Sequence, residues 1–196
     1  MLRTNLAPLD TYLADAMSLA GAEFLDRYPW PMLVVPEPSP DVLVRIRRPE
    51  TVIEDAANQS TTKINLNPRT LKGASLDALC LEVRPRRGGN GNRVSIGRSP
   101  EADVVLLDES VSRFHAEISW GTDRSQCVLK DLGARNSTLL EARPVTANVR
   151  IPLSSGMVLT FGALPTRFYT PEAFLEWVAT GAPRAGASPG KWPDRP

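Results

Sequence analysis

The sequence predicts a mainly β fold: an antiparallel β-sandwich with an N-terminal helix and a short C-terminal helix. Three observations predict it. Short β-rich runs recur between residues 76 and 170 and are separated by turn residues at the spacing of a sandwich. An apolar stripe at three- and four-residue steps near the N-terminus indicates an amphipathic helix. A proline followed by an acid starts a second helical segment at residue 171.

Length and charge limit the function classes. A chain of 196 residues holds one domain with extensions, or two small domains. With 23 basic and 22 acidic residues, the chain is not a polycationic nucleic-acid coat, so we expect no nucleic-acid partner. The single histidine, His115, excludes a His-rich metal site, and we expect neither a metal nor a cofactor. No signal peptide or membrane-spanning run is found, so we expect no membrane partner and a cytoplasmic location.

Residues 1–75 are predicted to form an extension that begins with the amphipathic helix, over 9–27. Pro29 and Pro31 end that helix. We expect its apolar face to pack on the body of the protein, the alternative being a partner-binding helix. The apolar stripe consists of Leu9, Leu13, Met17, Ala20 and Phe24.

The rest of the extension is rich in proline and then polar. Six prolines lie between residues 29 and 49, where short strands at 32–35 and 42–46 are possible. The mostly polar composition of residues 55–75 is typical of a linker.

A β-sandwich domain is expected over 76–170. It is followed by a helix over 171–180 and a tail over 181–196 that we expect to be disordered, since it is mostly Gly, Pro, Ala and Ser. The predicted strands are 78–83, 93–96, 104–107, 116–120, 126–130, 138–140, 149–151 and 158–161.

Three strand-to-strand connections carry the residues suited to binding. The first contains Gly97-Arg98-Ser99, the second Ser112-Arg113-Phe114-His115, and the third runs from Asp131 to Thr138. A β-sandwich clusters such loops at its ends, so we expect the three to form one site.

In this order, Gly-Arg, Ser-Arg-Phe-His and Asp-Leu-Gly-x-x-Asn-x-Thr resemble the motifs of the forkhead-associated (FHA) domain. The resemblance covers about residues 78–165. It implies an antiparallel β-sandwich whose loops bind a phosphothreonine peptide. The function implied is that of a signalling adaptor, whose partner is a phosphothreonine-containing protein, a Ser/Thr kinase or its substrate.

The resemblance assigns roles residue by residue. Arg98, Ser112 and Arg113 bind the phosphate, while Arg135 and Asn136 contact the peptide. The phosphate roles also suit the residues themselves, because a phosphomonoester carries almost two negative charges and a planar guanidinium engages two of its oxygens together. The resemblance assigns Gly97, His115 and Thr138 to the structural support of these loops.

Two positions depart from the family pattern. Ser137 stands where the family usually has glycine, and Arg135 where threonine is common. Serine costs about 1 kcal/mol at a positive φ, so we expect a changed loop shape. Three roles of Arg135 stay open: a further phosphate contact, an extension over the next peptide residue, or a block of the pocket that, in the family, accepts the threonine methyl group.

Two other functions were weighed. The first is a scaffold that keeps the fold and binds an unphosphorylated partner or itself. The second is an enzyme with Ser112 as nucleophile, His115 as base and Asp131 as the orienting acid. Residues three apart in an extended segment lie on opposite faces, and no nucleophile-elbow motif is present, so we predict no catalytic residue.

Overall fold

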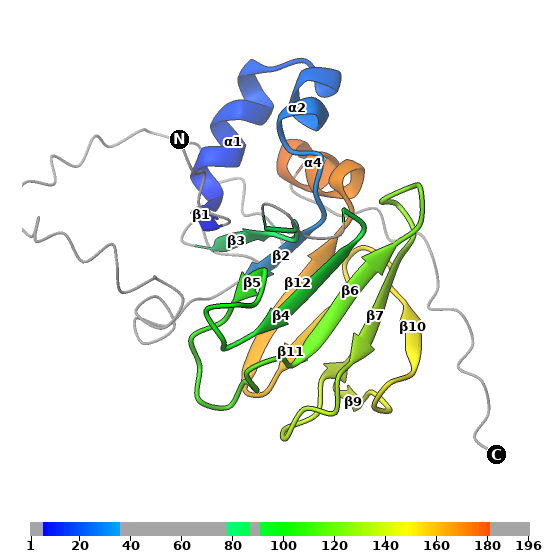
Figure 1. Ribbon diagram of the computed structural model, residues 1–196. Helices are drawn as coiled ribbons and strands as arrows, with labels where there is room; N and C mark the ends of the chain where they lie inside the picture. The colour runs from blue at the N-terminus through cyan, green and yellow to red at the C-terminus, as the bar shows by residue number, and fades with distance from the viewer. Residues whose placement is uncertain (1–5, 36–77, 87–90, 181–196) are drawn as a thin grey trace, which may run out of the picture.

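The computed structural model describes residues 6–35, 78–86 and 91–180, which form two packed β-sheets with helices at one end (Figure 1). The seven-stranded sheet has the order β1-β3-β2-β12-β11-β8-β9, and the five-stranded sheet the order β10-β7-β6-β4-β5. Every neighbouring pair is antiparallel except β4 with β5, which is parallel. The predicted β-sandwich is confirmed.

The strands are short. The seven-stranded sheet contains β1 (Leu6–Pro8), β2 (Met32–Val35), β3 (Leu79–Glu82), β8 (Leu139–Leu140), β9 (Arg143–Pro144), β11 (Val158–Phe161) and β12 (Leu164–Tyr169). The five-stranded sheet contains β4 (Arg93–Gly97), β5 (Val104–Val105), β6 (Ala116–Trp120), β7 (Cys127–Asp131) and β10 (Arg150–Pro152).

Alternating side chains build the core between the sheets. In β4, Val94 and Ile96 are fully buried while Arg93 faces solvent. Apolar side chains such as Leu33 and Phe168 meet them from the seven-stranded sheet in one contiguous cluster. Burial on this scale anchors the strand ends from which the loops of the candidate site emerge.

β12 was missed by the sequence analysis although it lies between β2 and β11. Pro165, near its start, argues against a strand, because proline removes a ladder hydrogen bond. Pro165 is nonetheless exposed and paired opposite Thr160. β1 and the two-residue β9 were missed as well, since segments this short carry almost no periodicity.

The single helix predicted over 9–27 is wrong. The structure has two helices there, α1 (Leu9–Ser18) and α2 (Gly21–Arg27). Leu19 and Ala20 both adopt extended backbone angles, with ψ of 147° and 151°. The carboxylate of Glu23 accepts a hydrogen bond from the Ala20 N–H at 3.1 Å, which supports a new helix start.

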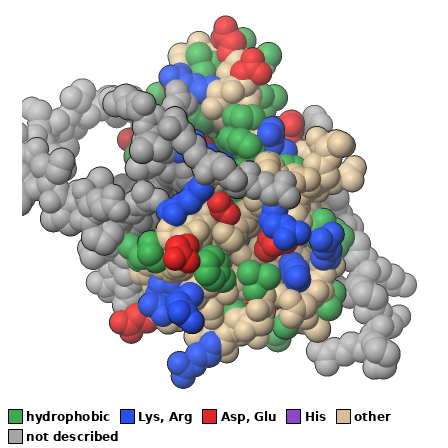
Figure 2. Space-filling view, in the orientation of Figure 1, with side chains coloured by type: hydrophobic (Ala, Val, Ile, Leu, Met, Phe, Trp, Pro, Cys, Tyr) green, Lys and Arg blue, Asp and Glu red, His purple; other side chains and the backbone are tan. Residues whose placement is uncertain are grey.

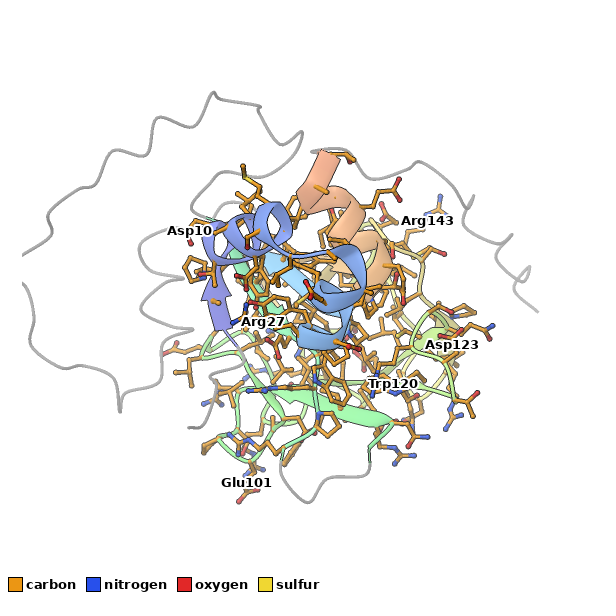
Figure 3. The ribbon with its side chains drawn as sticks, turned by 90° about the horizontal axis from the view of Figure 1, so that it is seen from above. Asp10, Arg27, Glu101, Trp120, Asp123 and Arg143 are labelled. Atoms are coloured by element: carbon orange, nitrogen blue, oxygen red, sulfur yellow. The ribbon has the colours of Figure 1, made fainter. Side chains whose placement is uncertain are left out.

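The predicted C-terminal helix is confirmed as α4 (Pro171–Thr180). Together α1, α2 and α4 cover the outer face of β2, β3 and β12 and enclose a second apolar cluster (Figures 1 and 3). Leu9, Tyr12 and Phe24 are buried in it, so the helical face packs on the body as expected. Met17, placed in the apolar stripe, is instead 79% exposed.

The segment before residue 76 also contributes to the sheet. β2 forms as expected at 32–35 and pairs with both β3 and β12, while β1 pairs with β3 at the edge. The possible strand at 42–46, the linker over 55–75 and the tail over 181–196 lie outside the described residues. Within the described ranges, none of the helices has the length and apolar character needed to cross a bilayer.

Candidate functional site

The three predicted loops meet at the end of the sandwich opposite the helices (Figure 1). The Arg98 N–H donates to the Ser112 carbonyl at 2.9 Å, and the Ser99 N–H donates to the Arg113 carbonyl at 2.9 Å. The Arg135 N–H donates to the Ser112 hydroxyl oxygen at 3.0 Å. The structure therefore joins the first and third loops through Ser112 of the second.

Gly97 makes this close approach possible. A Cβ atom at this position would lie 2.8 Å from the carbonyl carbon of Arg113 and closer still to its oxygen. These are backbone atoms, which cannot rotate aside. Glycine at the end of β4 lets the Ser112–His115 segment lie directly against the strand.

Each of the three loops that meet at Ser112 carries one arginine. Arg98, Arg113 and Arg135 are all exposed, and in the described part of the chain none of them forms an ion pair with a carboxylate. The Nε of Arg98 donates to the Val111 carbonyl at 3.2 Å, which orients its guanidinium. Basic side chains gather at this lower end of the molecule, with acidic side chains beside them (Figure 2).

The Ser112 hydroxyl is oriented by a hydrogen bond from the third loop. Its oxygen accepts from the Arg135 N–H, and its hydrogen has no acceptor among the described residues. That hydrogen is therefore free to donate to an incoming anion.

His115 supports the serine loop from below. It is fully buried, and its Nδ1 accepts a hydrogen bond from the Ser112 N–H at 3.1 Å. Burial lowers the pKa of His115 below 6.5, while the nearby Asp131 opposes that shift. A neutral imidazole with its proton on Nε2 fits this contact, because only an unprotonated Nδ1 accepts.

Asp131 organises the third loop. One carboxylate oxygen accepts from the N–H groups of Gly133 and Ala134, at 2.8 and 3.0 Å. The other accepts from the N–H and the hydroxyl of Thr138, both at 2.7 Å. Burial by itself raises the pKa of Asp131, but the hydrogen bonds from Thr138, Ala134 and Gly133 outweigh it and leave that pKa lowered.

The Asn136 amide holds the third loop to the second. Its Nδ2 donates to the Ser110 carbonyl at 2.9 Å. Its amide oxygen has no hydrogen-bond partner among the described residues. Ser110 in turn donates to Asp108 at 2.6 Å and accepts from the Ala163 N–H at 2.8 Å.

Asp108, Ser110 and Gly162 were missed by the sequence analysis. The Asp-x-Ser spacing at 108–110 is an Asx-turn signal, which indicates the local turn between Asp108 and Ser110 but not the contact with Ala163. Gly162 has a φ of +62°, and a Cβ there would lie 2.5 Å from Ser110.

The expected cost at Ser137 does not arise. Ser137 is not among the described residues that adopt a positive φ, and Gly133 takes that conformation in this loop, with φ of +78°. The loop therefore accepts serine at 137 without backbone strain. The changed loop shape expected from this serine stays a prediction.

A shallow hollow lies beside Ser112. It is lined by Ser99, Glu101, Ser112, Arg113 and Phe114. Glu101 and Phe114 were not among the predicted site residues, and isolated side chains of these types carry no motif. In the described part of the chain, no group of three His, Cys, Asp or Glu side chains is arranged to hold a metal ion.

Comparison with known proteins matches the central part of the chain to one family. A family model for the FHA domain matches residues 94–162. FHA domain-containing protein FhaB of Mycobacterium tuberculosis is 37% identical over 62 residues, which cover 32% of this chain and 39% of that protein. The FHA domain of the CT664 protein from Chlamydia trachomatis is 32% identical over 41% of this chain and 78% of that domain, with a TM-score of 0.37.

A further structure, from a study of phosphothreonine-dependent FHA domain interactions, is 28% identical over 45% of this chain and 81% of its own, with a TM-score of 0.38. The matched residues run from β4 to β11 and include the three loops that meet at Ser112. The chain is an FHA-domain protein. The matched region spans about two fifths of the length of the FhaB relatives.

Proposed function

We propose that this protein is a signalling adaptor that binds phosphothreonine peptides through the site around Ser112. The observation that carries the proposal is the junction of three loops at Ser112. Each loop carries one exposed arginine that forms no ion pair in the described structure. FHA domains as a family bind phosphothreonine, which supports the same assignment. The ligand is a protein phosphorylated by a Ser/Thr kinase, or the kinase itself.

The chemistry of the site suits a dianion. The guanidinium of Arg98 and that of Arg113 supply charge and donors, and the Ser112 hydroxyl supplies a further donor with its hydrogen free. Asn136 keeps its amide oxygen for a peptide N–H, since its Nδ2 is engaged with Ser110. Arg135 extends over the adjoining peptide, with its backbone fixed on Ser112. Gly97, His115 and Thr138 hold the loops that carry these groups.

Binding fits the geometry better than catalysis. The imidazole of His115 is engaged with the backbone N–H of Ser112, and the Ser112 hydroxyl is engaged with Arg135. The base and the nucleophile of the enzyme hypothesis are therefore not linked to each other, as that chemistry requires. Cys80 and Cys127 are buried free thiols, which supports a reducing compartment such as the cytoplasm.

Calorimetry with a phosphothreonine peptide library tests the proposal, with unphosphorylated and phosphoserine peptides as controls. We expect phosphothreonine peptides to bind and the unphosphorylated ones not to bind. Arg98→Ala should weaken binding about thirtyfold or more, since a charge-assisted contact is worth about 2 kcal/mol. Arg143→Ala is the matched control, an exposed arginine of β9 on the far side of the molecule from Glu101 (Figure 3).

The competing scaffold function has one observation in its favour, Arg135 at the position where threonine is common in the family. It predicts partners that bind without phosphate and are unaffected by Arg98→Ala. Absence of phosphopeptide binding at millimolar concentration overturns the adaptor proposal.

A further inference from the structure

The hollow beside Ser112 belongs to the binding surface. Ser112 and Arg113 line it and also belong to the proposed phosphate site. A peptide whose phosphate lies on Ser112 therefore enters this hollow at one side, and Glu101 and Phe114 are left to face the residues next to the phosphothreonine. The chemistry of the remaining lining residues decides which side chain fits there.

Glu101 brings a negative charge to this hollow. It is exposed and forms no ion pair with any described residue. Figure 3 shows Glu101 at the periphery, well away from the helices that carry Asp10 and Arg27. Its carboxylate is thus open to a ligand that approaches from solvent.

The loop that carries Glu101 is held in place by several contacts. Asp103 accepts from the N–H of Arg86 and from the N–H of Ser95, both at 2.8 Å. The guanidinium of Arg86 also donates to the Pro100 carbonyl, and the Glu101 N–H donates to the Ser99 hydroxyl at 3.3 Å. A carboxylate on a fixed loop loses less entropy when it pairs with a ligand.

Phe114 adds an aromatic surface to the same hollow. It is 45% exposed, which is unusual for a large apolar side chain next to a buried strand. Aromatic faces attract cations as well as apolar groups. The Glu101 carboxylate attracts a cation, and the Phe114 ring attracts both a cation and an apolar stem. A lysine or arginine side chain offers both groups.

Arg113, also in the lining, opposes a cation while the site is empty. A bound phosphate brings almost two negative charges to Ser112 and Arg113, so the potential in the hollow turns negative on binding. An acidic side chain would meet both the phosphate and Glu101. The occupied site therefore favours a basic neighbour.

We propose that the hollow formed by Glu101 and Phe114 selects a lysine or arginine side chain near the phosphothreonine of the bound peptide. The proposal rests on the phosphothreonine-binding function proposed above. It narrows the ligands to phosphothreonine segments with a basic residue within reach of the hollow.

The test uses phosphothreonine peptides in an alanine background, with a single arginine, alanine or glutamate moved through the flanking positions. Affinities are measured by fluorescence anisotropy. We expect one position at which arginine binds about three- to tenfold more tightly than alanine, and glutamate more weakly. Glu101→Gln should bring the ratio of the affinities for the arginine and alanine peptides towards one. Glu101→Lys should favour the glutamate peptide at the same position.

Glu109→Gln is the matched control, since Glu109 is an exposed acid near Ser112 that does not line the hollow. It should keep the ratio of the parent protein. Phe114→Leu should reduce the arginine preference without inverting it. An arginine preference that survives Glu101→Gln overturns the inference, as does the absence of any position-specific preference. In both cases tight binding of the alanine-background peptide leaves the adaptor function standing, whereas no binding of any peptide contradicts that function itself.

Discussion

Gly97 and Arg113 lie so close together that a β-carbon on Gly97 would overlap the Arg113 carbonyl. The loop over residues 112–115 therefore lies directly against the end of β4. There the Arg98 N–H donates to the Ser112 carbonyl and the Ser99 N–H donates to the Arg113 carbonyl. The distance between Arg98 and Ser112, the two proposed phosphate ligands, is therefore set by the backbone. The absence of a side chain at residue 97 makes this close approach possible.

Gly97→Ala should both destabilise the protein and weaken phosphopeptide binding. The added methyl group meets backbone atoms, so the loop must shift, at a cost of about 1–3 kcal/mol. Urea unfolding and calorimetry measure the two effects. Gly121→Ala is the control, because a Cβ there has nothing within 4 Å and should change stability by less than about 0.5 kcal/mol. Equal stability of the two variants would show that the loop yields without strain.

Asp131→Asn should destabilise the fold by about 3 kcal/mol at pH 7. The carboxylate is 2% exposed and accepts four hydrogen bonds, whereas an amide presents its NH₂ group to two of those donors. Asp123→Asn, at an exposed turn where the carboxylate accepts from Ser125, should cost much less. Chemical denaturation of both variants makes the comparison, and similar losses would contradict the role of Asp131.

The stabilisation from Asp131 should depend on pH in a defined direction. Its pKa is lowered in the folded state, so the folded protein keeps the carboxylate ionised where the unfolded chain binds a proton. The contribution is complete above about pH 4 and is lost as pH falls through the folded pKa. The difference in unfolding free energy between the parent and Asp131→Asn should shrink below about pH 4. A difference that is constant with pH would contradict the shift.

The order of the motifs predicted that three loops form one site, and the structure brings these loops together at Ser112. The roles of the individual site residues stay a prediction. Gly-Arg, Ser-x-x-His and Asp-Leu-Gly each stand in a connection between two strands, and a sandwich clusters such connections at its ends. The Ser110 anchor and the Glu101 and Phe114 hollow depend on contacts between residues far apart in the chain. Ser110 meets Ala163 across 53 positions, which no local pattern indicates.

Secondary structure was predicted correctly where the apolar residues alternate over a whole strand. Elements were missed where contacts with distant residues determine the backbone conformation. β6 forms over 116–120 as predicted, because alternating Ala116, Ile118 and Trp120 face the core. β12 was missed because Pro165 argues against a strand, yet exposure of that position leaves its pairing intact. The break between α1 and α2 was missed because its contacts are tertiary or local to the break: Ala20 donates to Glu23, and Arg27 of α2 pairs with Asp15 of α1.

His115 should titrate below pH 6.5, the ordinary value for histidine. Burial disfavours the imidazolium, so the unfolded chain binds a proton at a pH where the folded protein does not. The contribution to stability is therefore complete above pH 6.5 and falls as pH drops from there towards the folded pKa. NMR follows this directly, because His115 is the single histidine of the chain. A midpoint at or above 6.5 would contradict the argument.

Ala142→Gly should stabilise the protein by about 1 kcal/mol. Glu141 and Ala142 form the turn between β8 and β9 with φ of 49° and 61°, a conformation that glycine adopts without a Cβ penalty. Glu141 is kept, because its carboxylate accepts the Val158 N–H at 2.7 Å. Ser137→Gly is the contrasting variant: Ser137 has no positive φ, so glycine there only increases the freedom of the unfolded chain and should be neutral or destabilising. Thermal unfolding ranks the two, and a larger gain from Ser137→Gly would show that the strain lies in the binding loop instead of the hairpin turn.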